Sequence, residues 1–465
     1  MTIGSDSYSR IAKLFVDRDD LSVDDARRQL EQFRLVLRCG PEVASSPTLQ
    51  AAALTAANVA NRCFPGGVRV DLARDFPLRV PWTPGSTFLK ALVDIAGPRV
   101  HNSSGADWEK AQTIAFGSMA RDFRGLQATF DGWTAAVSPF TEIVRLPERE
   151  ACVLAGVLVG GLAISELFLG NFGISIEAGS QPVGLSLWRP DMAWDDETAA
   201  AVDMPLNFLP GELWLLGLGH LGQAFAWACS FLPYSNPTDV RLVLQDFDRL
   251  VEANLDTGLL SRRHDLGRTK TRIAADFLEN RGFQPRLVER RFDENTCPQR
   301  DDPAIVLSGM DSAGPRHLLD QAGFDMVVDC GVGGTVANFD SMTLQVLPTP
   351  HASAESIWPP RDAEDVARRE RFARKLANSR GTYQDVATQH RCGHVELAGR
   401  SIAVPFVGAV AAALSLSELC RRLMGGPSYV RIQSQLGSIQ STAAKINIAN
   451  EPRLRTTFQA VVYDE

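Results

Sequence analysis

The chain has 465 residues, of which 45% are hydrophobic and 22% charged, so it is long enough for two or three domains with large cores. Its formal net charge of −8 excludes a general affinity for nucleic acid, whereas an acidic surface is compatible with a small-protein partner. No secretory signal pattern opens the chain and none of its eight cysteines forms a CxxC pair, which favours a cytoplasmic location.

The first element with a clear start is a helix that begins at Ser22. Ser22 is a fair N-cap, and Asp25 follows three residues later. The apolar pattern predicts that this helix continues through Leu37 and ends near Gly40, which is followed by proline.

The first 195 residues share an order of elements with the rest of the chain. In both parts a helix leads into a strand, and in both a later alanine-rich helix ends in the residues Ser-Glu-Leu. The matched pairs are residues 49–72 with 223–244 and residues 150–168 with 401–420. We interpret this as a degenerate internal duplication, with an inactive first half supporting an active second half as an intrachain pseudo-dimer. Coincidence between two alanine-rich helices is the alternative, and a further homodimer stays open.

A connection divides the two halves. Residues 170–210 contain four widely spaced prolines and an acidic stretch, which break any long element. The predicted domains are therefore residues 1–195 and 205–465. Residues 151–169, in the first half, carry a glutamate and several glycines and predict a core helix, not a membrane span.

The second half opens on the most informative stretch. Residues 213–216 form an apolar run, and residues 217–222 read GLGHLG before a helical pattern. A strand, a tight glycine turn and a helix are typical of a nucleotide-binding unit, because the helix N-terminus offers free N–H groups to a phosphate. A second strand, residues 240–244, ends at Asp246, where a ribose hydroxyl is usually held. These features predict an α/β fold with a doubly wound, Rossmann-like sheet.

The residues after this strand resemble the ubiquitin-activating family, the ThiF- and MoeB-like adenylating enzymes. The resemblance rests on the glycine loop, an Asp-x-Asp strand end (Asp246 and Asp248), a V-x-x-x-N-L-like turn at Asn254 and a D-L-G-x-x-K helix entry at Lys270. It implies a fold that binds ATP and joins AMP to the C-terminal carboxylate of a small protein or peptide. The residues it assigns to ATP are Gly217, Gly219, Gly222, Asp246, Asp248, Asn254 and Lys270.

The resemblance also implies residues that act on the triphosphate. Asp311, at the end of an apolar strand, matches an acid that holds Mg²⁺, although a helix N-cap is the plainer alternative. Arg34 fits the spacing of an arginine that reaches ATP from the other half, although it also fits a solvated helix arginine. The family arginine that follows the N-L turn is replaced by Thr257, and Arg262, Arg263 and Arg268 are its candidate substitutes.

The end of the chain adds a crossover loop at about residues 349–400 and a small C-terminal sheet at about residues 429–465. In the family the crossover loop covers the substrate tail. Cys392 lies in it beside His390, Arg391 and His394, and nearby cations would favour the thiolate. Cys392 is therefore a candidate acceptor of the substrate as a thioester, and an inert loop thiol is the alternative. Many relatives hold zinc on two CxxC pairs, and their lack here predicts no zinc.

The predicted function is ATP- and Mg²⁺-dependent adenylation of a ubiquitin-like protein, a sulfur carrier or a peptide, with lysine, arginine and aspartate side chains stabilising charge. A downstream conjugating partner fits this chemistry, and no nucleic acid or membrane partner is expected. A non-catalytic nucleotide-binding scaffold and an NAD-type oxidoreductase are the alternatives.

Overall fold

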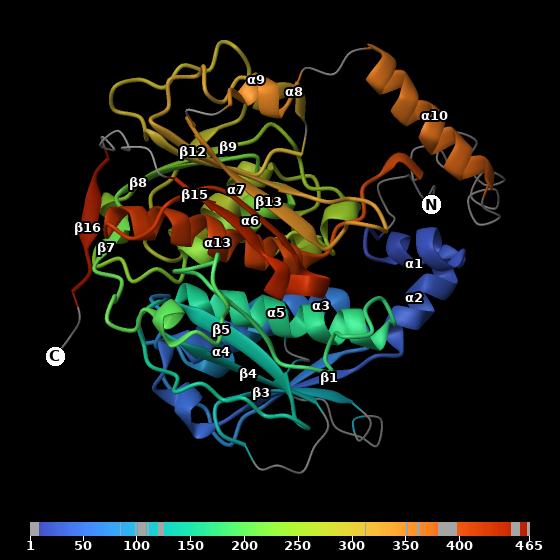
Figure 1. Cartoon of the computed structure of the whole chain (residues 1–465), viewed down its shortest axis with the longest axis vertical. Helices are drawn as coiled ribbons and strands as arrows, with labels where there is room; N and C mark the ends of the chain where they lie inside the picture. The colour runs from blue at the N-terminus through green and yellow to red at the C-terminus, as the bar shows by residue number, and fades with distance from the viewer. Residues whose placement is uncertain are drawn as a thin grey trace.

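The computed structural model describes residues 9–83, 85–97, 100, 108, 111–119, 125–311, 313–349, 352–359, 363–379, 398–447 and 456–462. Across these ranges the chain is a mixed α/β protein with two sheets that contain parallel strands, which confirms the predicted class. Four helices lie between the two sheets (Figure 1). They are α3 (Pro47–Cys63), α5 (Leu154–Asn171), α6 (His220–Cys229) and α13 (Pro405–Leu423).

The first sheet has six strands in the order β2-β1-β3-β4-β5-β6. Strands β2, β1, β3 and β4 run parallel, and β5 and β6 are added antiparallel at one edge. The strands are β1 (Leu35–Cys39), β2 (Val68–Asp71), β3 (Gln112–Phe116), β4 (Gly125–Asp131), β5 (Thr134–Pro139) and β6 (Val183–Ser186).

The second sheet has eight strands in the order β10-β9-β8-β11-β12-β13-β14-β15, of which the first five run parallel and the last three antiparallel. Its parallel strands are apolar because helices and loops cover both faces. The strands are β8 (Glu212–Leu216), β9 (Arg241–Gln245), β10 (Arg286–Val288), β11 (Ile305–Ser308), β12 (Met326–Val332), β13 (Ser341–Leu347), β14 (Tyr429–Gln435) and β15 (Ala443–Ile446).

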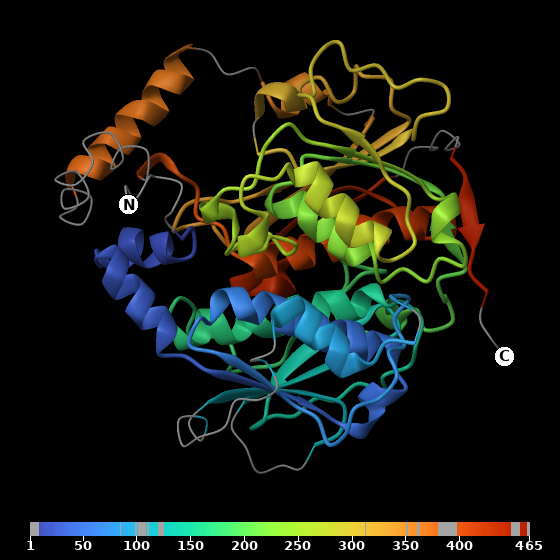
Figure 2. The same cartoon turned by 180° about the vertical axis from the view of Figure 1, so that it is seen from behind.

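The two sheets repeat one plan of connections. The unit β1-α3-β2 matches β8-α6-β9 in order and direction, and β3, β4 and β5 match β11, β12 and β13. Helix α5 leads from β5 to β6, just as α13 leads from β13 to β14. The first half lies on one side of the helix layer and the second half on the other, as both views show (Figures 1 and 2).

The remaining helices lie outside this layer or at its ends. They are α1 (Ala12–Asp19), α2 (Val23–Glu31), α4 (Phe88–Ala96), α7 (Lys270–Glu279), α8 (Ala313–Arg316), α9 (Ala354–Ile357) and α10 (Ala363–Ser379). Short 3-10 turns occupy Pro41–Ala44, Glu197–Ala200, Pro237–Asp239, Glu252–Asn254, Arg263–Asp265 and Leu436–Ser441. Helix α10 stands away from both sheets, on the side where α1 and α2 lie (Figure 1).

The prediction of one long helix from Ser22 through Leu37 is wrong at its C-terminal end. Ser22 does cap it, since its hydroxyl accepts a hydrogen bond from the N–H of Asp25 at 3.0 Å. The helix nevertheless ends at Glu31, and Leu35 to Cys39 form β1 between two parallel strands. The buried Leu-Val-Leu run fits either element, and pairing with β2 and β3 decides in favour of a strand.

The strands of the small C-terminal sheet predicted for residues 429–465 are present, but they belong to two different sheets. Strands β14 and β15 extend the large sheet, whereas β16 (Phe458–Ala460) pairs with β7 (Phe208–Pro210) in a two-stranded ribbon. The alternating pattern showed correctly that these segments are strands. It carried no information on their partners, because strand pairing is set by tertiary packing.

The helices at the centre pack closely because small residues face one another. A Cβ on Gly160 would lie 2.5 Å from the carbonyl oxygen of Ala52 in α3, and one on Gly161 would lie 3.1 Å from Val410 in α13. Of the helices described, α5 is the one long and apolar enough to cross a membrane, and 89% of that stretch is buried inside the protein.

The paired Ser-Glu-Leu sequences of α5 and α13 have different surroundings. In α13 the buried Glu418 forms ion pairs with Arg421 and Arg422, the second at 2.7 Å. In α5 the matching Glu166 is also buried and accepts a hydrogen bond from the N–H of Gly179 at 2.8 Å. Burial raises the pKa of Glu166 from 4.5 to about 7, and the Gly179 N–H opposes this only in part.

This difference predicts that the effect of Glu166→Gln on the free energy of unfolding depends on pH. Between pH 4.5 and 7 the folded state keeps a proton that the unfolded state has lost, so the free energy of unfolding falls as pH rises through that window. The variant should match the wild type near pH 5 and exceed it by up to about 3 kcal/mol at pH 8 in urea titrations. An equal difference at both pH values would contradict this. Glu418→Gln, which breaks a buried ion pair, should destabilise at both.

Candidate functional site

The glycine loop lies where β8 ends and α6 begins. Gly217 has a φ of +80°, which favours glycine, and its N–H donates to the carbonyl oxygen of Gln245 at 2.9 Å. A Cβ on Gly222 would overlap the carbonyl oxygen of Gly217, so only glycine allows the helix to pack on the strand here. A Cβ on Gly219, by contrast, would meet no atom within 4 Å. Protein atoms therefore pack against the loop at Gly217 and Gly222, whereas the space next to Gly219 is open.

A cavity of about 580 Å³ lies in front of this loop, at the carboxyl ends of the parallel strands β8, β9, β11 and β12. We refer to it as the nucleotide-sized cavity. This is where doubly wound sheets bind ligands. The predicted residues that line it are Gly217, Gly219, Asp246, Asp248, Asn254, Lys270 and Asp311. Gly222 lies behind the loop, where it permits packing and does not face the cavity.

Asp246 is bound to the glycine loop. Its carboxylate accepts hydrogen bonds from the N–H groups of Leu218 at 2.6 Å and Asp248 at 2.8 Å. Burial raises the pKa of Asp246, while the charge of Lys270 opposes the rise. Asp246 therefore fixes the loop in place, and a contact to a ribose hydroxyl stays a prediction.

Lys270 is the first residue of α7 and is 8% exposed. Its Nζ donates to Asp248 at 2.8 Å. Asn254 is positioned by a local turn, because its Oδ1 accepts from the N–H of Val251 at 3.1 Å. The side-chain amide nitrogen of Asn254 and the Lys270 ammonium thus supply donors at one wall of the cavity.

Arg10 is a cavity residue that the sequence did not reveal. It lies just before α1 in the first half, in a polar segment without a motif, and its Nε donates to the carbonyl oxygen of Ser401 at 2.9 Å. Burial lowers the pKa of Arg10, whereas the charge of Asp311 across the cavity raises it. The first half therefore contributes a cation beside Asp311.

Arg34, the residue expected in that role, lies elsewhere. It precedes β1 at the amino end of that strand, where its carbonyl oxygen accepts from the N–H of Gln112 at 3.1 Å, and it does not line the cavity. The prediction assumed a long helix at this point. Because the chain forms a strand instead, Arg34 lies at the amino end of β1 and not at the cavity.

The proposed substitutes for the missing family arginine are also absent from this cavity. Thr257 is buried, Arg263 is exposed and pairs with Glu252 at 3.4 Å, and Arg262 and Arg268 line a different cavity. Cationic groups reach the nucleotide-sized cavity from other positions. They are Arg10, Lys270, Arg290, Arg291 and Arg316.

Two of these arginines are held in fixed positions. Arg316 donates to the carbonyl oxygens of Met310 and Cys330 and lies 3.3 Å from the carboxylate of the buried Asp329. The guanidinium of Arg291 lies over the ring of Phe247, 4.0 Å from its centroid. Arg316 thus forms the floor of the cavity, and the Arg291–Phe247 pair forms a flat wall.

Cys392 and its neighbouring cations fall in residues 380–397, which lie outside the described residues. Its role as a thiol acceptor stays a prediction. Within the described ranges no group of three histidine, cysteine, aspartate or glutamate side chains is arranged to hold a metal. Asp311 therefore fits a Mg²⁺ site only where phosphate oxygens and waters supply the other ligands.

Two models of known protein families match this chain. A model of the BilD N-terminal domain matches residues 34–187, and a model of the BilD C-terminal domain matches residues 209–426. The bacterial E1-like protein BilD of Collimonas sp. (strain OK412) is 35% identical over 443 residues, which cover 95% of this chain and 94% of that protein.

These matches define the chain as a bacterial E1-like protein, the class expected from its resemblance to the ubiquitin-activating family. It belongs to the BilD family. The two matching models describe BilD and not ThiF itself.

Partial matches among solved structures include crystal structures of E. coli MccB. The structure with succinimide is 16% identical, with a TM-score of 0.35, over 53% of this chain and 66% of that one. The structure with ATP is 15% identical, with a TM-score of 0.33, over 52% and 65%.

Proposed function

We propose that this protein adenylates the C-terminal carboxylate of a small ubiquitin-like protein, sulfur carrier or peptide, with ATP as the second substrate. One observation carries the proposal: a glycine loop open at Gly219 faces a cavity into which both halves of the chain direct cations. The pyrophosphate of a dinucleotide carries less negative charge than a triphosphate, so a cavity lined by this many cations suits a triphosphate better. The E1-like family membership supports the same reaction class.

In this reaction an oxygen of the substrate carboxylate forms a bond to the α-phosphorus, and the bond to the β-phosphate oxygen breaks to release pyrophosphate. The glycine loop and the N-terminus of α6 would bind phosphate oxygens. Lys270, Arg10 and Arg316 would stabilise the charge that develops on them. Asp311 would hold Mg²⁺, and the Arg291–Phe247 pair offers a surface on which the adenine can stack.

We also propose that the two halves arose by internal duplication and that the first half is inactive. The shared plan of connections supports this. In the first half the turn after β1 contains Pro41 and Glu42 in place of a glycine loop. The carboxylate of Glu42 accepts from the N–H of Ser118 at 2.9 Å and pairs with Arg145 at 3.1 Å. An internal anion thus lies at the turns where a phosphate would have to bind.

A second step would transfer the activated acyl group to the thiol of Cys392, with release of AMP, before a conjugating partner takes it. This part of the proposal rests on the cations that flank Cys392 in the sequence. A cytoplasmic location, in which the thiol would stay reduced, belongs to the same proposal.

Exchange of labelled pyrophosphate into ATP tests the proposed function, with Mg²⁺ and candidate small proteins or peptides that have a flexible C-terminal tail. Exchange should require a partner, and Asp311→Ala should reduce it by about 100-fold because the metal would lose its protein ligand. Asp301→Ala, at an exposed aspartate outside the cavity, is the matched control and should behave as wild type.

Exchange and nucleotide-binding measurements together distinguish the scaffold and the oxidoreductase from the proposed enzyme. ATP binding without exchange for any partner would favour the scaffold, and binding of NADH in place of ATP would favour the oxidoreductase. For the second step, Cys392→Ala should keep exchange but lose a reductant-sensitive adduct on a non-reducing gel. Cys297→Ala, at the exposed cysteine among those described, should keep both.

A further inference from the structure

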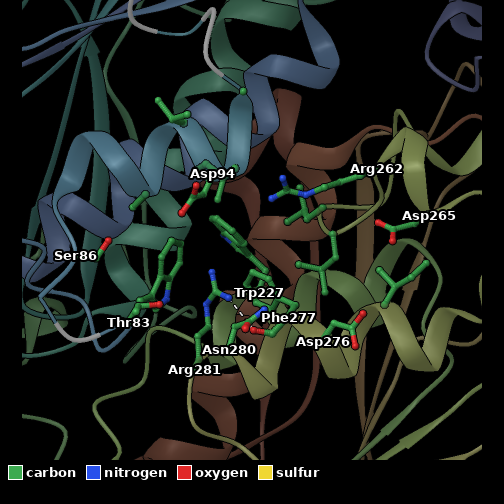
Figure 3. Close-up of a pocket in the computed structure, with 18 of the residues that line it drawn as sticks. Thr83, Ser86, Asp94, Trp227, Arg262, Asp265, Asp276, Phe277, Asn280 and Arg281 are labelled. Carbon is green, nitrogen blue, oxygen red and sulfur yellow. Dashed lines mark hydrogen bonds between the residues drawn. The ribbon is translucent and has the colours of Figure 1, made fainter.

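A second cavity, of about 740 Å³, lies between the two halves and away from the glycine loop. Helix α4 of the first half lines one side, and α7 with residues 259–268 of the second half lines the other. The close-up shows Arg262 and Arg281 extending into this space from the second half, with Asp94 approaching from α4 (Figure 3). No residue lines both cavities.

The two arginines are cations without a carboxylate partner. Neither forms an ion pair within 4.0 Å among the described residues, and the Nε of Arg281 is buried without a hydrogen-bond partner there. Burial and, to a smaller extent, the charge of Arg262 lower the pKa of Arg281 to about 9, and the charge of Asp94 opposes both. Two guanidinium groups thus repel each other in a partly desolvated space.

The acidic residues around the cavity are already neutralised by other cations. Asp94 pairs with Lys90 at 2.7 Å, Asp265 pairs with Arg268 at 2.6 Å, and Asp276 pairs with Arg268 at 2.5 Å. Because these carboxylates pair with other cations, they balance the charges of Arg262 and Arg281 only in part. An anion from outside the chain would remove the repulsion between them.

The wall beside the arginines is aromatic. The guanidinium of Arg281 lies 4.1 Å from the ring centroid of Trp82 and 3.5 Å from that of Phe277. Trp227 packs against both rings, at 5.4 Å from Trp82 and 5.8 Å from Phe277. Such a wall favours a planar apolar body and disfavours a fully hydrated ion.

We propose that this cavity is a binding site for a small organic anion, with its acid group between Arg262 and Arg281 and an aromatic or otherwise apolar body against Trp82 and Phe277. The occupant touches both halves and acts as a link between them. Helix α7, which borders this site, begins at Lys270 in the nucleotide-sized cavity. The proposal does not depend on the adenylation reaction.

Calorimetric titration of the full chain tests this with 2-naphthoate and its uncharged counterpart 2-naphthamide. Naphthoate should bind at one site per chain, and naphthamide should bind at least about tenfold more weakly because it lacks the charge. Arg262→Gln and Arg281→Met should each weaken naphthoate binding by about tenfold. Arg263→Gln, the exposed neighbour of Arg262 outside the cavity, should leave it unchanged.

Arg262 is exposed, so its replacement does not endanger folding even where the loss of the half-buried Arg281 does. Saturating ATP should leave naphthoate binding intact, since the two cavities share no residue. The proposal is overturned by absence of binding to the wild type, by equal binding of the acid and the amide, by full affinity in Arg262→Gln, or by displacement with ATP.

Discussion

Gly219→Val should weaken ATP binding by about tenfold or more while the protein stays folded, and Gly222→Ala should unfold it. At Gly219 a side chain would enter open space in front of the loop, where the proposed phosphates lie, and φ is negative at −76°. At Gly222 the added Cβ would overlap the Gly217 carbonyl oxygen, at a cost of about 3 kcal/mol or more. Equilibrium dialysis with ATP and thermal melts separate the two effects.

Valine is a poorer N-cap than glycine, so Gly219→Val should itself lose about 1 kcal/mol of stability. Gly97→Ala is no suitable control, because its φ of +85° would strain any side chain. Ala224→Val, in the buried part of α6, is the complementary control. It should lower the stability of the protein and leave ATP affinity unchanged, because Ala224 does not line the cavity. ATP affinity unchanged in Gly219→Val would show that the nucleotide does not bind at this loop.

Arg10→Met should reduce pyrophosphate exchange by about 100-fold or more, whereas Arg34→Met should leave it within about threefold of wild type. Arg10 reaches the cavity beside Asp311, and the loss of a desolvated cation there removes charge stabilisation of the transferred phosphate. Arg34 lies at the amino end of β1, outside the cavity. Exchange is measured with saturating partner and titrated ATP.

Arg10→Lys is the informative third variant, since it keeps the charge but not the hydrogen bond from Nε to the Ser401 carbonyl. It should recover part of the exchange lost in Arg10→Met. Loss of exchange in Arg34→Met together with normal exchange in Arg10→Met would reverse the assignment and support the spacing argument made from the sequence.

The sequence predicted the elements of the second half because local pattern and final structure agree there. The run before Gly217, the helix after Gly219 and the strand before Asp246 each form where expected. It failed at β1, where the same Leu-Val-Leu run satisfies a helical and an extended pattern. Only the neighbouring strands, whose residues are far away in the chain, decide between the two.

The sequence likewise predicted some residues of the candidate site and missed others. Residues that one motif brings together, such as Asp246, Asp248 and Lys270, line one cavity in the structure. Arg10 was missed because a single arginine in a polar segment has no spacing to recognise. Arg34 matched a spacing, but spacing along the chain does not fix the direction of a side chain once the element type changes. The three candidate substitutes for Thr257 were chosen because they follow it closely in the chain, which does not place them in the same cavity.

The contribution of Arg10 has a consequence for how activity depends on protein concentration. In this chain the arginine and the glycine loop belong to one polypeptide, so both line the same cavity of a single molecule. Exchange per mole of protein should therefore stay constant on dilution from micromolar to nanomolar. An enzyme that borrows its arginine from a separate subunit would lose activity as the subunits dissociate.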